Sequence, residues 1–139
     1  MHTIDRFYKV HDNFYQTALK EIHYGKKLSH WMWYIFPQLK FLGHSYNSTY
    51  FGLENTEEAR LFYSDEYLGA NLREICHALL ECNSDDALEL MGYPDNIKLQ
   101  SSMTLFSKAT GDELFKKVLD KFFEGREDPQ TTGWLDMFN

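Results

Sequence analysis

Residues 3–24 read TIDRFYKVHDNFYQTALKEIHY, and the spacing of their apolar side chains decides the fold class. The apolar positions recur at steps of three and four residues and are Phe7, Val10, Phe14, Ala18 and Ile22. This period places them on one face of an amphipathic helix. Thr3 is a suitable N-cap, and Gly25 suits the left-handed position just past the end. We therefore expect a long first helix whose apolar face enters a core.

The chain beyond this helix repeats the same period between capping residues. Ser29 is predicted to cap a shorter helix that Pro37 ends. Further helices are expected over residues 55–63, from 64 or 65 to about 82, over 84–92, from 95, and over 112–124, with a final short turn at 128–129. Residues 43–52 lack a helical period and are predicted to form an ordered loop. The prediction is an all-α, compact single-domain bundle of about seven or eight helices spanning residues 1–139.

Composition limits the classes of protein to consider. A chain of 139 residues has the size of one domain, and it buries about two-thirds of its unfolded surface without needing a disulfide or metal. No run of 18 apolar residues is present, so no membrane span is expected. The N-terminal residues lack the apolar core of a secretory signal. A cytoplasmic location is therefore expected.

Charge is distributed unevenly along the chain. Residues 1–40 hold six basic and three acidic residues, whereas residues 41–139 hold eight and eighteen. A protein that binds duplex nucleic acid needs a basic surface, so this partner is not expected. Cys76 and Cys82 lie six positions apart, which is too far on one helix for a disulfide. A single Glu74–His77 pair does not make a metal site, and no metal or cofactor is predicted.

Residues 29–38, Ser-His-Trp-Met-Trp-Tyr-Ile-Phe-Pro-Gln, form the first candidate site. Trp31 and Trp33 point about 200° apart on a helix, so one core face does not take both rings. The residues before them are basic, and His30 is of a type that changes charge near neutral pH. An indole face stacks on a planar group or holds a cation. The alternative is that both rings belong to the core.

The second candidate is residues 98–106, Lys-Leu-Gln-Ser-Ser-Met-Thr-Leu-Phe. Lys98, Ser101 and Ser102 share one helix face, opposite an apolar stripe. Serine and threonine are mediocre helix formers, so their concentration here costs helix stability. A polar cavity or a ligand would explain that cost. The simpler alternative is a solvated helix face.

The motif from His30 to Leu39, the motif from Asp95 to Phe106, and residues 119–131 together resemble the domain of unknown function 1810 family. The similarity extends from about Asp5 to Thr132. It implies a compact, mainly helical single domain, and it brings no activity or catalytic residues with it. A looser similarity, in motif style only, is to the helical NADAR proteins linked to ADP-ribose chemistry, which also combine an aromatic motif with a helix bearing Lys and Met.

Two functional hypotheses follow. In the first, a small anionic ligand, such as a nucleotide or ADP-ribose-like compound, binds between residues 29–38 and 98–106. Its ligand-binding residues would be His30, Trp31, Trp33, Gln38, Lys98, Ser101 and Ser102. In the second, the aromatic segment is an exposed face that binds a partner protein, without catalysis. A third possibility is that both motifs only hold a helix junction together. The sequence does not decide whether the protein is an enzyme.

Overall fold

The computed structural model describes residues 3–138, which form nine α-helices, one 3-10 helix and no β-strand. The helices are α1 (Asp5–Tyr24), α2 (Met32–Ile35), η1 (Lys40–Leu42), α3 (Tyr46–Phe51), α4 (Thr56–Ser64), α5 (Glu66–Glu81), α6 (Ala87–Met91), α7 (Asp95–Thr110), α8 (Glu113–Phe123) and α9 (Pro129–Phe138). The all-α prediction is confirmed. The expected seven or eight helices are slightly too few.

Most predicted helix boundaries are confirmed by capping hydrogen bonds. Asn55 accepts from the Glu58 amide, Asp65 accepts from the first turn of α5, and Asp112 accepts from the Leu114 amide. Gly25 ends α1 in the left-handed conformation with φ 98°. These short polar side chains satisfy amides that have no partner inside the helix.

Two predicted caps differ in the structure. Ile4 occupies the cap position of α1 without a side-chain hydrogen bond, but the neighbouring Thr3 hydroxyl accepts from the Asp5 amide at 3.3 Å. Ser29 does not cap α2, which begins at Met32 and has only four residues. The Ser29 hydroxyl is instead donated to Glu21, at 2.6 Å. The hydroxyl that the local sequence assigns to a cap therefore donates to a buried carboxylate on α1 instead.

The predicted loop at residues 43–52 contains α3. Ser45 caps this helix by accepting from the Ser48 amide at 3.1 Å. The 3-10 helix η1 precedes α3. An isolated parallel bridge between Leu39 and Leu53 joins the two ends of the segment that contains both elements. Both η1 and α3 are short, and α3 is rich in turn formers without an apolar stripe, which is why periodicity does not reveal them. The expected final short turn is the start of α9, a helix of ten residues.

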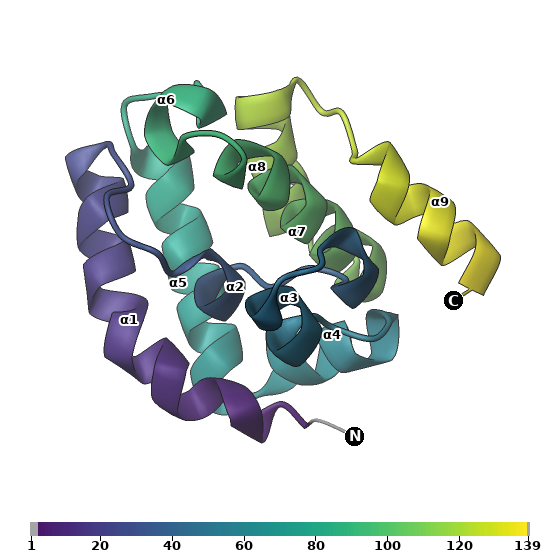
Figure 1. The fold of residues 1–139 in the computed structure, drawn as a ribbon. Helices are drawn as coiled ribbons and strands as arrows, with labels where there is room; N and C mark the ends of the chain where they lie inside the picture. Colours follow the sequence, from purple (N-terminus) through teal and green to yellow (C-terminus); the bar gives the residue numbers. More distant parts are fainter. Residues whose placement is uncertain (1–2, 139) are drawn as a thin grey trace.

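Figure 1 shows the arrangement of the helices around one core. Helix α1 packs along α5, α7 packs against both α4 and α8, and α5 also contacts α8. Helix α9 lies at the outside, where it contacts α7. Across residues 3–138, no helix is both long and apolar enough to span a bilayer.

Candidate functional site

The short helix α2 is positioned by a buried carboxylate on α1. Glu21 accepts hydrogen bonds from the Leu28 and Ser29 amides at 2.8 and 3.0 Å. It also accepts from the Ser29 hydroxyl and from the Trp31 indole, at 2.6 and 2.9 Å. These four bonds hold the connection from α1 to α2 against the end of α1.

The environment of Glu21 keeps this carboxylate ionised. Burial by itself raises the pKa of Glu21, but the hydrogen bonds it accepts outweigh burial and lower the pKa below its ordinary value. Trp31, whose indole N–H is donated to Glu21, is 0% exposed. The Lys27 ammonium lies 4.9 Å from the centre of the Trp31 ring. Trp31 is therefore enclosed by the fold on this side of α2.

A second buried residue of α1 holds the other part of α2. The Nδ1 atom of His11 lies 2.9 Å from the Tyr34 carbonyl oxygen, and its Nε2 lies 3.2 Å from the Asn71 amide nitrogen. Nδ1 is therefore the protonated ring nitrogen, donating to the carbonyl, while Nε2 accepts. Burial lowers the pKa of His11, despite the opposing effect of the Tyr34 carbonyl. The neutral ring thus links α1, α2 and α5.

Trp33, within α2, borders a hollow of about 110 Å³. We call it the basic hollow; its lining residues are Lys27, His30, Met32, Trp33, Tyr34, Asn47, Asp95 and Lys98. The Lys98 ammonium lies 5.9 Å from the centre of the Trp33 ring. His30 is exposed at the same hollow.

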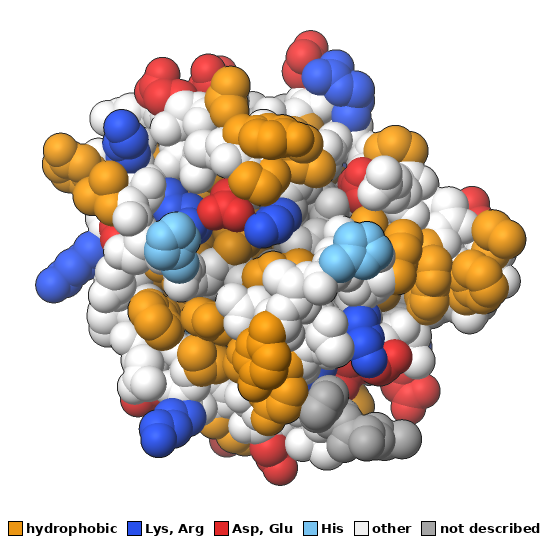
Figure 2. Space-filling model, in the orientation of Figure 1, with side chains coloured by type: hydrophobic (Ala, Val, Ile, Leu, Met, Phe, Trp, Pro, Cys, Tyr) orange, Lys and Arg blue, Asp and Glu red, His pale blue; other side chains and the backbone are white. Residues whose placement is uncertain are grey.

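The charges in the basic hollow do not balance. The Asp95 carboxylate contacts the Lys27 ammonium at 2.8 Å and the Lys98 ammonium at 3.5 Å. One carboxylate therefore faces two cations, and the more accessible of these is Lys98, whose side chain is 31% exposed against 6% for Lys27. On the face shown in Figure 2, basic, acidic and histidine side chains gather around a depression over α2 and α3.

The predicted site residues separate into two groups. His30, Trp33 and Lys98 meet at the basic hollow. Trp31, Gln38, Ser101 and Ser102 are buried and do not line it.

The two serines are bonded within the fold. Ser102 donates its hydroxyl to the Pro37 carbonyl at 2.8 Å, and Ser101 donates to Asp128 at 2.9 Å. The expected proximity of the two motifs is real, but at this contact it is a helix junction. The alternative of a solvated helix face does not hold for these serines, because both are buried.

Several residues of the site are absent from the sequence-based prediction. Glu21 stands on the polar edge of the first helical stripe and has no signal that marks it as buried. Asn47 belongs to the segment expected to be a loop, which α3 brings to the hollow. Asp95 is identified from sequence only as a helix start. Charge balance between Asp95 and Lys98, three positions apart, is the signal that would have drawn attention to it.

Comparisons with known proteins agree with this fold. A family model described as a protein of unknown function (DUF1810) matches residues 1–135. The crystal structure of the conserved hypothetical protein Rv1873 from Mycobacterium tuberculosis is similar over 96% of each chain, with 35% sequence identity and a TM-score of 0.93. No curated protein matches the chain.

Proposed function

Since the chain belongs to the DUF1810 family, whose description assigns no activity, we propose a function from geometry alone: the basic hollow binds the anionic group of a small ligand. The group would lie between Lys98 and His30, beside the ring of Trp33. Phosphate and carboxylate groups have the required charge. A nucleotide or an ADP-ribose-like compound carries such a group.

The proposal rests on the two unequal contacts of Asp95, a short one to Lys27 and a longer one to Lys98. Lys27 is almost fully buried and makes the shorter contact to Asp95, so it neutralises most of that carboxylate. Lys98 keeps a longer contact and remains partly open to solvent. A cation held against an aromatic ring at the mouth of a small hollow is available to a second anion. That anion would complete the charge balance.

The size of the hollow limits what enters it. A volume of about 110 Å³ is well below the roughly 300–1,000 Å³ of sites that enclose a drug-sized ligand. It therefore suits one phosphate or carboxylate group, with the rest of the ligand outside. Asn47 and Tyr34 add polar groups to the lining that would orient the bound oxygen atoms.

Burial does not favour the alternative of an exposed aromatic face at residues 29–38. Trp31, Trp33 and Phe36 are all buried. A protein partner would therefore meet the polar edge of the hollow rather than the tryptophan rings. Aromatic hot spots of protein interfaces must be accessible to the partner, and these three rings are not.

A thermal-shift titration with inorganic phosphate, pyrophosphate, AMP and ADP-ribose tests the proposal. A ligand that binds only the folded state stabilises it by about 2.7 kcal/mol at a hundredfold excess over its dissociation constant. Lys98→Met should abolish the shift, since it keeps the alkyl chain on Trp33 but removes the charge. Lys108→Met, at the other end of α7, is the matched control because Lys108 is paired with Glu127, away from the hollow. Equal shifts in both variants, or no shift with any anion, would overturn the proposal.

A further inference from the structure

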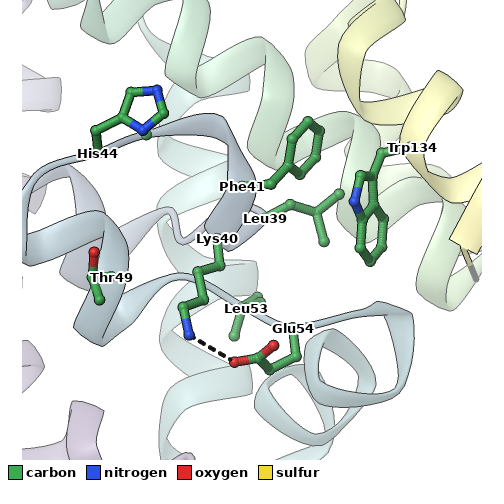
Figure 3. A pocket seen from close by; sticks show the side chains of 9 residues that line it. Leu39, Lys40, Phe41, His44, Thr49, Leu53, Glu54 and Trp134 are labelled. Carbon is green, nitrogen blue, oxygen red and sulfur yellow. Dashed lines mark hydrogen bonds and ion pairs between the residues drawn. The ribbon is translucent and has the colours of Figure 1, made fainter.

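A second and larger hollow, of about 370 Å³, lies between residues 39–54 and Trp134 of α9. We call it the α9 pocket; Leu39, Phe41, Leu53 and Trp134 form its apolar walls, and Lys40 and Glu54 lie at its polar side (Figure 3). Its volume is within the range of sites that enclose small molecules. It is lined by residues other than those of the basic hollow, and the inference drawn from it is independent of the proposed function.

The floor of the α9 pocket is fixed by backbone hydrogen bonds. The Lys40 amide donates to the Leu53 carbonyl, and the Leu53 amide donates to the Gln38 carbonyl, both at 2.9 Å. Gly52 permits this close approach, because a Cβ atom there would lie 2.4 Å from the Lys40 Cα. Leu39 and Leu53 are consequently held in place, and because both are fully buried they close the base of the pocket from behind.

The aromatic wall comes from two distant segments. The rings of Phe41 and Trp134 are stacked, with centroids 5.4 Å apart and planes 14° apart. Trp134 also packs against Phe138, with ring centroids 5.3 Å apart. The indole is half-buried and borders the cavity beside Phe41 (Figure 3). Within the described part of α9, Thr131 is the one buried residue, so tight packing does not fill the space under the helix. A planar ring can extend the existing stack.

The polar side of the pocket offers a donor next to an acceptor. The Lys40 ammonium contacts the Glu54 carboxylate at 3.2 Å, and these side chains are 40% and 56% exposed. An ion pair this accessible contributes little stability. A ligand that donates to Glu54 and accepts from Lys40 would therefore replace the pair at small cost.

We infer that the α9 pocket binds a small planar heteroaromatic molecule whose edge carries an N–H donor beside a carbonyl acceptor. The ring stacks on the half-buried Trp134 beside Phe41, above the backbone that joins residues 39–40 to Leu53. The N–H donates to Glu54, and the carbonyl accepts from Lys40. Apolar walls with a few convergent polar groups are the usual composition of such sites.

Three related probes separate the parts of this inference. Isoquinolin-1(2H)-one has the bicyclic ring and the lactam edge, its N-methyl derivative lacks the donor, and naphthalene lacks both polar groups. Calorimetric and saturation-transfer titrations should rank the lactam first. Loss of one stacking partner typically costs about 1–3 kcal/mol, so Trp134→Leu should weaken lactam binding by roughly fivefold or more. Met137→Ala, an exposed position on the same helix, should leave binding unchanged.

A second variant tests the inference even if Trp134→Leu disturbs α9. Glu54→Gln removes the charge of the acceptor together with its ion pair to Lys40. It should weaken binding of the lactam relative to binding of the N-methyl derivative. The inference is overturned if the lactam does not bind the native protein at millimolar concentration. It is also overturned if the three probes bind equally, or if Glu54→Gln and Trp134→Leu both bind the lactam as the native protein does.

Discussion

Trp31 and Trp33 are two residues apart, each has a lysine over its ring, and the surroundings of the two differ completely. Trp31 is 0% exposed, and its indole nitrogen is paired with Glu21. Trp33 is 6% exposed and borders a hollow that contains polar groups. In this aromatic motif the first ring therefore anchors the segment, and the second ring lines a candidate site.

Lys27 and Lys98, which lie over the two rings, differ in burial in the same way. Lys27 contacts Asp95 and also donates to the Ser29 carbonyl, with its side chain 6% exposed. Lys98 has the longer contact to the same carboxylate and is 31% exposed. We therefore distinguish an anchored side of α2, which includes Glu21, Trp31 and Lys27, from an open side with Trp33 and Lys98. The anchored side should determine stability, and the open side should determine binding.

Removal of Glu21 should break the anchored side most severely. Glu21→Ala leaves the buried Trp31 indole and two part-buried backbone amides without their acceptor. Each unsatisfied buried donor costs about 1–3 kcal/mol, so we expect a loss of about 3 kcal/mol or more in the free energy of unfolding. Urea denaturation at pH 7 measures it. A loss below about 1 kcal/mol would show that Glu21 does not anchor α2.

The pH dependence of that loss provides its control. The pKa of Glu21 is lowered in the folded protein from its ordinary 4.5. A lowered pKa means that the unfolded chain binds more protons, so the stabilisation is complete above pH 4.5 and disappears as the pH falls through the folded pKa. Glu21→Gln should therefore be less stable than the native protein at neutral pH, and the gap should narrow in acid. A constant gap would argue against a role for the charge.

Lys27→Met should have the next largest effect, about 2 kcal/mol of destabilisation, because a nearly buried cation loses its partners while Asp95 keeps only Lys98. The Ser29 carbonyl also loses its donor. Thermal unfolding detects a change of this size as a fall in Tm of several degrees. Lys26→Met removes a charge from the exposed neighbouring position and is the control. Equal effects at the two positions would mean that Lys27 is an ordinary surface charge.

Periodicity predicts the long helices well, because their stability comes from apolar stripes that meet in one core. Helix α1 ends at Gly25 as expected, and α5, α7 and α8 carry their predicted apolar faces inward. Two short elements are predicted less well, since both depend on contacts with distant residues: α2 has four residues instead of the expected helix from Ser29, and α3 replaces an expected loop. Glu21 decides where residues 28–31 go, and nothing within that segment reveals it.

The candidate site is predicted only where exposure and charge decide the outcome. His30, Trp33 and Lys98 line one hollow, where residues 29–38 and α7 come together. Helix spacing groups Ser101 and Ser102 with Lys98. In the structure, however, Ser101 donates its hydroxyl to Asp128, and Ser102 donates its hydroxyl to the Pro37 carbonyl. Spacing along one helix predicts which residues share a face. It does not predict which neighbouring helix already supplies their hydrogen-bond partners.

Lys98→Met should have the smallest effect on stability of these variants. The contact to Asp95 is 3.5 Å long and partly exposed, so its loss should change the free energy of unfolding by no more than about 0.5 kcal/mol. Methionine keeps the apolar cover on Trp33, and Lys27 continues to neutralise Asp95. Urea denaturation of Lys98→Met beside Lys27→Met measures the contrast between two lysines that share one carboxylate. If Lys98→Met were as destabilising as Lys27→Met, both cations would be part of the anchor, and the basic hollow would have no charge left for a ligand.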